Sequence, residues 1–530
     1  MGEYNINGLA IPLFLVFMVI EYLYLRLNGR YLHRFNDNVT SISMGLCLLV
    51  SDALLKAYTF AVFIVIWDQY RVVDFDSASL VTWVVFFVGV DFCYYWFHRI
   101  AHEVNFLWGA HVGHHQSEEY NLTTALRQSA FQYAFSWVFY LPLAFFGCPP
   151  EVFLIQFVIL KMYQFWLHTP AINRIPWLEG IFSTPSSHRV HHAKNPVYID
   201  RNYGGTLVIW DRFFGTWQPE LVAETCHYGT TRPLDTLNPI KANLQHWSML
   251  AKDTLHTDRW QDKVKLWFKP TGWRPEDCQE KDSELQQTGC VNREKFDPQT
   301  TLGIKVYVAI SMLVIFSVST MFLFLAPKLS AFELTLGVMV IVGGVVIANQ
   351  FLENNLRYWF VELVRLPLML WLASSLWLTP SSTTVVNSVV MEKAPLEVLN
   401  YASSPGLWPE WHPQSSKVFV DSARPLMRGE GFEEDILTPI GKNHLVWDVV
   451  ESEPGKIWIA HAVNQNNGSI IQLEYRVKPE GEHTVFERTL NYQLPNFAYL
   501  VLNTLYFKKT VEKKSADALV RLKGAVESRG

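Results

Sequence analysis

Apolar residues gather in long runs in two parts of the chain, and these runs predict membrane-spanning helices. A helix needs about 20 mostly apolar residues to cross a bilayer. The runs that reach or approach this length are Leu9–Leu25, Ser41–Trp67, Leu80–Phe97, Leu302–Leu325 and Ala331–Ala348. Two shorter runs, Gln132–Phe146 and Val152–Leu167, flank the turn signal Gly147-Cys148-Pro149-Pro150 and predict a helical hairpin. The pattern predicts an α-helical, multi-pass integral membrane protein.

One further apolar run, Leu356–Leu378, is ambiguous. It carries Arg357, Glu362 and Arg365, and charged side chains are costly in the hydrocarbon region. The segment therefore either spans the membrane or lies in the interface. Whether this segment spans the membrane decides on which side of the membrane the C-terminal part lies.

Basic residues predict the orientation of the spans. Arg26, Arg30 and Arg34 follow the first run, whereas residues 68–79 are mostly acidic, and more Lys and Arg lie in 98–128 and 168–301. Cytoplasmic loops are enriched in Lys and Arg. We expect an external N-terminus and cytosolic histidine-rich regions. The membrane would be the cell inner membrane in a bacterium or the endoplasmic reticulum in a eukaryote.

The last quarter of the chain changes from apolar runs to an alternation of apolar and polar residues at strand period. A strand near Ser388–Glu392 comes first, a short helix near Leu396–Ser403 follows it, and several further strands come next. A long helical stretch, capped by Asn496, closes this region. With the Trp408-Pro409-Glu410-Trp411 segment, this order resembles the START-like helix-grip fold of the polyketide cyclase type. The resemblance implies either a module for a hydrophobic ligand or a domain with a filled core.

Composition excludes several classes of protein. Half of the 530 residues are hydrophobic and only 18% are charged, which excludes a disordered chain. The net charge of −5 offers no basic surface for nucleic acid. Six cysteines, none in a Cys-x-x-Cys pair, do not form a disulfide framework and indicate a reducing compartment.

Histidines carry the strongest chemical signal. Nine of the seventeen lie between residues 98 and 192. His98 and His102 are four residues apart at the end of an apolar run and share one helix face. The spacing His-x-x-His-His occurs twice, at His111, His114 and His115 and at His188, His191 and His192, and His168 stands alone. Imidazole binds iron, zinc and copper, and eight or nine histidines suit two metal ions.

These motifs resemble the fatty acid hydroxylase/sterol desaturase superfamily. Three further stretches are similar to its alkylglycerol monooxygenase branch: residues 114–129 (HHQSEEYNLTTALRQS), residues 163–169 (YQFWLHT), and NYGG with WDRFFGT between residues 202 and 216. The resemblance covers roughly residues 38–238. The helix-grip tail departs from that branch, which places the substrate in doubt but leaves the metal site intact.

The resemblance implies a membrane-bound di-iron oxygenase. Its ligands would be the eight motif histidines, with His168 as a ninth ligand or a supporting residue. Glu103 and Glu119 are candidate acceptors that orient the imidazoles, although Glu103 could instead pair with an Arg. Asn121 and Asn202 are candidates for the same supporting role or for plain capping and turns. Arg127, Tyr203 and Asp211 are expected to support the structure.

The implied activity is hydroxylation of a lipid C–H bond with O2, with ether cleavage of an O-alkyl glycerol favoured. The alternatives are a sterol or fatty-acyl hydroxylase or desaturase, a zinc enzyme acting on a lipid, and a lipid-binding or transport protein with a vestigial site. The branch implies tetrahydrobiopterin as reductant, and no Rossmann or haem motif supplies another, so we expect an external electron donor.

The expected domain layout has four parts. Residues 1–240 form the membrane-bound oxygenase domain, 241–301 a polar linker, 302–380 additional transmembrane or interfacial helices, and 384–530 the helix-grip domain.

Overall fold

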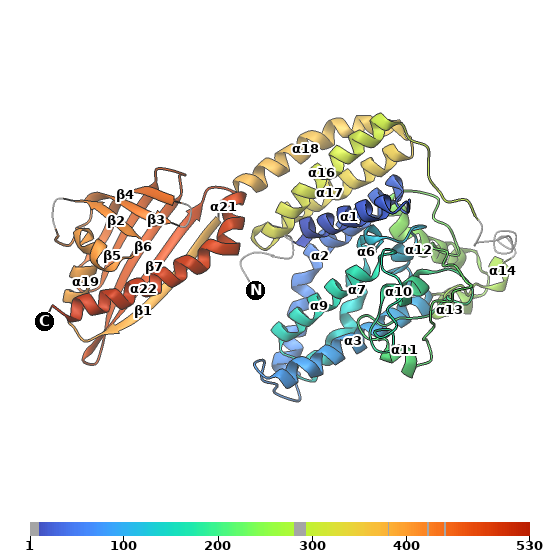
Figure 1. The fold of residues 1–530 in the computed structure, drawn as a ribbon, viewed down its shortest axis with the longest axis horizontal. Coiled ribbons are helices and arrows are strands. Elements are labelled where there is room, and N and C mark those ends of the chain that lie inside the picture. The colour runs from blue at the N-terminus through green and yellow to red at the C-terminus, as the bar shows by residue number, and fades with distance from the viewer. Residues whose placement is uncertain (1–9, 280–292, 380, 421–422, 439–440, 530) are drawn as a thin grey trace. The chain divides into compact units, whose positions relative to one another are not determined.

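The computed structural model describes residues 10–279, 293–379, 381–420, 423–438 and 441–529. These form two compact units, divided between Leu372 and Ala373 (Figure 1). The first unit is helical, and the second contains the sheet. Leu9, at the start of the first apolar run, and residues 280–292 of the expected linker lie outside the described residues.

The predicted spans are helices. The long ones are α1 (Ala10–Leu27), α2 (Phe35–Tyr70), α3 (Leu80–Glu103), α16 (Leu302–Leu325), α17 (Ala331–Leu352) and α18 (Trp359–Leu378). Within the described residues, five segments are long and apolar enough to cross a membrane: Phe35–Leu55, Leu80–Glu103, Leu302–Lys328, Ala331–Leu352 and Leu356–Leu378. The multi-pass helical architecture is therefore confirmed.

The predicted hairpin is continuous in only one arm. α9 (Pro150–Leu167) is a regular helix, whereas residues 132–145 break into α7 (Gln132–Ser136), a 3-10 turn (Trp137–Tyr140) and α8 (Leu141–Phe145). Pro142 lies at the start of α8, where its missing N–H leaves no helical hydrogen bond unmade. The broken arm lets Gln132 reach the histidine-rich loop.

Residues 241–301 contain helices that pack on the first unit. α12 (Pro239–His256) and α13 (Trp260–Phe268) bury Leu250 and Leu266. Asn105 ties α13 to the loop after α3, because its side chain donates to the carbonyl of Leu266 at 3.0 Å. Apolar positions as sparse as those of α12 and α13 do not resemble a span, so the sequence pattern indicated only a polar stretch.

Two of the three charges that made Leu356–Leu378 ambiguous satisfy each other. Glu362 and Arg365 are 2% and 5% exposed and form an ion pair. Tyr307 of α16 donates to Glu362, and Arg365 donates to Ser311 at 3.1 Å. Pairing of this kind reduces the cost of charge in a membrane segment, which is consistent with a span.

The second unit is a seven-stranded antiparallel sheet with a long helix, as expected for a helix-grip fold. The strands are β1 (Ser381–Met391), β2 (Ser415–Phe419), β3 (Gly431–Thr438), β4 (Gly441–Glu453), β5 (Ile457–Asn464), β6 (Ile470–Glu480) and β7 (His483–Leu494). Their order is β1-β7-β6-β5-β4-β3-β2. The chain ends in α21 (Phe497–Leu502), a π-helical turn (Asn503–Phe507) and α22 (Lys508–Glu527).

The core of this unit is rich in aromatic side chains. Trp408 and Trp411 belong to α20 (Trp408–Trp411), which follows the helix α19 (Pro395–Ala402). Both pack with Tyr475 of the sheet and are at most 1% exposed. Burial of aromatic surface on this scale is a main source of stability in a small domain.

Candidate metal centre

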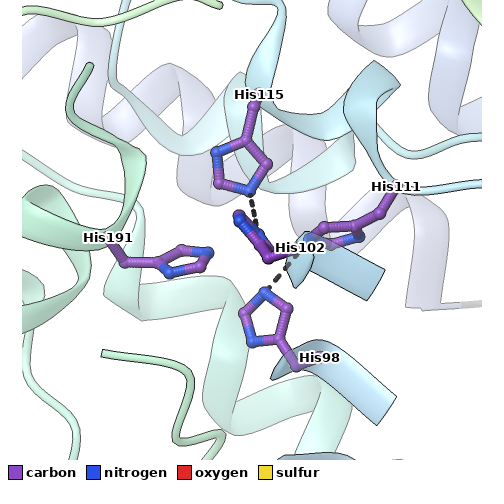
Figure 2. A group of neighbouring side chains, drawn as sticks. All are labelled: His98, His102, His111, His115 and His191. Atoms are coloured by element: carbon purple, nitrogen blue, oxygen red, sulfur yellow. Dashed lines mark hydrogen bonds between the residues drawn. The ribbon is translucent and has the colours of Figure 1, made fainter. Parts of the chain in front are cut away.

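The nine histidines of the sequence pattern come together in two adjoining groups. The first group is His98, His102, His111, His115 and His191, and the second is His114, His168, His188 and His192. Within each group, one nitrogen of every ring lies within 4.8 Å of the others. Figure 2 shows the first group, with rings from three segments pointing at a common centre. Every one of the nine side chains is at most 5% exposed.

Four helices and their caps position these rings. α3 supplies His98 and His102 from one face of its last turns. α5 (Val112–His115) and α10 (Pro185–His192) carry the two His-x-x-His-His motifs. α10 begins with a capping box, in which Thr184 accepts from the backbone of Ser187. His168 is the residue that ends α9.

Each His-x-x-His-His motif divides its rings between the two groups. His111 and His115 enter the first group and His114 enters the second. On α10 the division is reversed, because His191 enters the first group while His188 and His192 enter the second. The stacked rings of His115 and His192, 4.4 Å apart, mark where the groups adjoin. Both groups therefore depend on both motifs.

Backbone and side-chain acceptors orient the rings. The Nδ1 atoms of His98, His114, His168 and His191 face the carbonyl oxygens of Tyr203, Arg127, Gln164 and Arg201 at 2.7–2.9 Å. His111 Nδ1 faces Gln132 Oε1 at 3.2 Å. A carbonyl oxygen only accepts, so Nδ1 carries the proton in these rings and Nε2 is the free ligand atom.

The Nε2 atoms within each group face one another. His98 and His111 approach to 3.0 Å, His102 and His115 to 3.1 Å, and His168 lies 3.0–3.2 Å from His114, His188 and His192. Lone pairs that point at each other repel unless a cation lies among them. His191 Nε2 is buried without a hydrogen-bond partner, as expected of a ligand atom.

Burial favours the neutral imidazole that a metal requires. It lowers the pKa of His111 and His168 to about 3 and that of His191 to about 4. Burial also lowers the pKa of His114 and His192. Neutral imidazole suits iron, zinc and copper. The five-nitrogen and four-nitrogen groups therefore fit two metal ions, including the two irons that the sequence resemblance implies.

Three of the predicted supporting residues, Glu103, Asn121 and Asn202, have hydrogen-bond partners other than the imidazoles. Glu103 accepts from Arg99 at 2.9 Å, which is the ion pair considered as its alternative. Asn121 caps α6 (Leu122–Leu126) by accepting from the backbone of Thr123. Asn202 donates to the carbonyl oxygens of Ser187 and Gln218, which ties α10 to the following loop.

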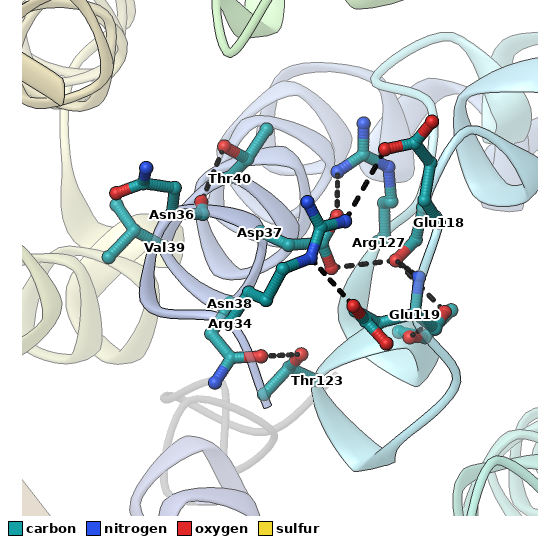
Figure 3. Close-up of polar contacts among 12 residues, drawn as sticks. Arg34, Asn36, Asp37, Asn38, Val39, Thr40, Glu118, Glu119, Thr123 and Arg127 are labelled. Carbon is teal, nitrogen blue, oxygen red and sulfur yellow. Dashed lines mark hydrogen bonds and ion pairs between the residues drawn. The ribbon is translucent and has the colours of Figure 1, made fainter. Parts of the chain in front are cut away.

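Glu119 belongs to an ion-pair network with Arg34, Glu118, Asp37 and Arg127 (Figure 3). It accepts from Arg34 at 2.6 Å and from Lys295 at 2.8 Å. Arg127 lies 3.9 Å from Asp37 and donates to the carbonyl of Gly113 at 3.0 Å. The network holds the loop that presents the Arg127 carbonyl to His114, so it supports the site indirectly.

The atoms that face the imidazoles could not be identified from the sequence. Most are backbone carbonyls, which leave no mark on the sequence. Gln132 and Asp200, whose Oδ1 lies 3.6 Å from His102 Nδ1, are separated from the histidine motifs along the chain. Asp211 acts as expected in a structural role, because it accepts from the backbone of Tyr203 and Gly204 at 2.8 Å.

A pocket lies against the second group. It has a volume of about 660 Å³ and is lined by Arg189, Glu220, Tyr228 and other residues of the polar stretch. Tyr120 forms part of its wall and stacks on His168, with ring centroids 5.8 Å apart. A polar molecule in this pocket would be separated from the histidines by one aromatic ring.

Comparison with known proteins agrees with this geometry. Residues 83–216 match the fatty acid hydroxylase family, and residues 382–527 match the family of polyketide cyclases, dehydrases and lipid transport proteins. The alkylglycerol monooxygenase of Xenopus tropicalis is 48% identical over 46% of this chain and 54% of its own length. The Homo sapiens enzyme is 43% identical over 50% of this chain and 59% of its own length.

More distant similarities are found for the histidine-rich region and for the C-terminal region. The ornithine lipid hydroxylase OlsE of Rhizobium tropici is 34% identical over 24% of this chain and 40% of its own length. Among solved structures, the Zhui aromatase/cyclase of Streptomyces sp. R1128 is 14% identical, with a TM-score of 0.24 over 28% of this chain and 96% of its own. The chain thus spans just over half of the alkylglycerol monooxygenases that it matches. Residues 83–216 are thus similar to the fatty acid hydroxylase family and contain most of two histidine groups that could each hold a metal ion, and residues 382–527 are similar to the polyketide cyclase and lipid transport family.

Proposed function

We propose that this protein is a membrane-bound di-iron monooxygenase that uses O2 to hydroxylate a C–H bond of a lipid. The observation that carries the proposal is the division of nine buried histidines into two adjoining groups with facing Nε2 atoms. His98, His102, His111, His115 and His191 would hold one iron. His114, His168, His188 and His192 would hold the other.

When bound, such a pair of irons supplies the reduction of O2 and the oxidising power for C–H cleavage. The chain supplies geometry. The carbonyls behind Nδ1 fix the direction of each ring, and the buried rings of Tyr95 and Phe97 on α3 exclude water beside the groups. The intact histidine set disfavours a lipid-transport protein with a vestigial site.

The substrate we favour is an O-alkyl glycerol. The similarity to alkylglycerol monooxygenases supports this substrate over a sterol or a fatty-acyl chain. Insertion of one oxygen atom beside the ether oxygen gives a hemiacetal, and the other oxygen atom leaves as water with two electrons and two protons. The hemiacetal C–O bond then breaks, which gives an aldehyde and a glycerol. The two electrons come from an external donor, for which we propose tetrahydrobiopterin.

The test combines metal analysis with product analysis. Purified protein in lipid nanodiscs should contain two irons per chain and release aldehyde from an alkylglycerol, O2 and tetrahydrobiopterin. His114→Ala and His191→Ala should each lose iron and turnover. His256→Ala is the matched control, because His256 is exposed at the end of α12. Full turnover by metal-free protein would contradict the proposal, and iron with sterol or acyl products alone would reassign the substrate.

A further inference from the structure

Apolar side chains are exposed in the helical stretch that closes the helix-grip domain. Leu502, Leu505 and Tyr506 are 48%, 59% and 61% exposed. Residues three and four apart lie on one side of a helix, so these three side chains form one apolar patch. Leu500 and Leu519 of the same stretch are buried instead. Other positions of the stretch therefore form the core, and the apolar patch is not part of it.

A buried asparagine fixes the direction in which the apolar patch faces. Asn503 lies in the π-helical turn Asn503–Phe507 and is 2% exposed. Its side chain donates to Thr383 Oγ1 of β1 at 3.0 Å and accepts from the Tyr492 hydroxyl of β7 at 2.7 Å. Turns of this kind inside helices are frequent at functional sites. Asn503 therefore faces the sheet, and the apolar patch faces away from it.

The same hydrogen bond holds the apolar patch near the membrane. α18 ends at Leu378 and β1 begins at Ser381, so Thr383 lies within about 18 Å of Leu378 even if the chain between them is fully extended. Trp377 is 44% exposed, and tryptophan is enriched at membrane–water interfaces. Whether α18 spans the membrane or lies in the interface, the residue that ends it lies at the membrane surface. Asn503 and the apolar patch beside it are therefore held close to that surface.

Lysines follow the apolar patch in the first two turns of α22. They are Lys508, Lys509, Lys513 and Lys514. Four lysines and one glutamate give residues 508–514 a formal charge of +3, in a chain whose net charge is −5. Lys509 and Lys513 come three and seven residues after Tyr506, which places them on the side of the apolar patch. The helical stretch thus presents an apolar end and a basic continuation on one side.

We propose that the apolar patch and these four lysines, which together we call the α21–α22 face, lie on the anionic surface of the membrane that α18 enters. Apolar side chains next to lysines are typical of helices that lie in the membrane–water interface. The leucines would enter the headgroup region, and the ammonium groups would bind lipid phosphates. The positive charge favours an anionic over a neutral bilayer. Docking would hold the helix-grip domain at the membrane surface, where the short link after α18 alone would leave it free to turn.

The experiment measures the depth of a fluorescent NBD label on the full chain in lipid nanodiscs, with the native cysteines replaced. In nanodiscs that contain phosphatidylserine, a label at Leu505→Cys should be quenched by nitroxide groups on the lipid acyl chains. A label at Val463→Cys is the matched control, because Val463 of β5 is 46% exposed. Its neighbour Ala462 belongs to the core, so Val463 faces the other side of the sheet. The Val463 label should stay in water.

Charge variants test the choice of an anionic surface. Lys509→Gln combined with Lys513→Gln should lower the ratio of docked to undocked domains by about 30-fold, or about 5-fold for each lysine. Lys478→Gln is the matched control, because Lys478 is exposed on β6. Salt should weaken docking of the wild type, because it screens the lysines. The Tm of the three proteins should agree, because all these side chains lie at the surface.

Four results would overturn the proposal. Equal quenching of the Leu505 label in phosphatidylcholine alone would remove the preference for anionic lipid. A Leu505 label that lipid nitroxides do not quench and water-soluble iodide does would show that the α21–α22 face stays in water. A label shielded from iodide without lipid quenching would assign the apolar patch to a protein contact. Equal lipid quenching of the labels at Leu505 and Val463 would show that the label itself enters the bilayer.

Discussion

At the scale of single residues, the metal centre depends on acceptors that hold Nδ1 rather than on acidic side chains. Four of the nine rings face backbone carbonyls, and His111 faces Gln132. Replacing a backbone acceptor is not possible by mutation. Gln132 is therefore a position at which the orientation of a histidine can be tested directly.

We predict that Gln132→Leu lowers iron affinity and turnover by about 10- to 100-fold, because His111 loses the acceptor that fixes its ring. Gln132→Glu keeps an acceptor at the same place and should restore most of the iron content. The measurement is iron per chain together with the rate of aldehyde release. Equal iron content in the Leu and Glu variants would show that the contact does not orient His111.

At the scale of elements, α10 is the helix on which both groups depend, since it supplies one ring to the first group and two to the second. Its eight residues are too few for a stable isolated helix. The capping box formed by Thr184 and Ser187 therefore has a large share in its stability.

Thr184→Ala is expected to cost about 1 kcal/mol of stability and to loosen the rings of α10. The readouts are the Tm and the iron retained after dialysis against a chelator. Ser330→Ala removes the equivalent capping box of α17, which carries no site histidine. This control should lose similar stability but keep its iron, and iron loss in both variants would contradict a local effect on α10.

At the scale of the whole molecule, the histidine centre is buried within the helical unit, while its surrounding loops are exposed. Val222 lies in the polar stretch and is fully exposed, and Val72 follows α2 and is 57% exposed. These two positions sample the opposite sides of the membrane that the Lys and Arg distribution predicts.

With the native cysteines replaced, Val222→Cys should react with an impermeant maleimide only after the membrane is permeabilised. Val72→Cys should react in intact cells. The reverse pattern would invert the predicted orientation, and labelling of both positions in intact cells would rule out a topology with the two loops on opposite sides.

Acid should destabilise the metal-free protein. The pKa values of His111, His168 and His191 are lowered in the folded state, to about 3, 3 and 4. The unfolded chain therefore binds more protons than the folded chain. Stability is lost as the pH falls below about 6.5, the pKa of histidine in the unfolded chain. Each histidine contributes up to ~1.4 kcal/mol per pH unit. We expect the Tm of the metal-free protein to fall between pH 7.5 and 5.5, and a constant Tm would contradict this.

The sequence by itself determined the elements and the chemistry. Run length predicts a membrane segment because a bilayer has a fixed thickness, and strand period predicts the sheet because alternate residues face alternate sides. The nine histidines could likewise be identified, because imidazole has few other reasons to occur at such density. Glu103 and Asn121 were less predictable, since a polar side chain can meet many partners and the sequence does not say which is near.

Only the tertiary structure decided how those parts combine. It divided each His-x-x-His-His motif between two groups, because the direction of a ring depends on the packing of α5 against α10 and not on spacing alone. It also brought Trp411, Tyr475 and Arg488 together, because register pairs β6 with β7 and α20 packs against the sheet. Contacts such as these arise from long-range packing, which a pattern of local periodicity does not contain.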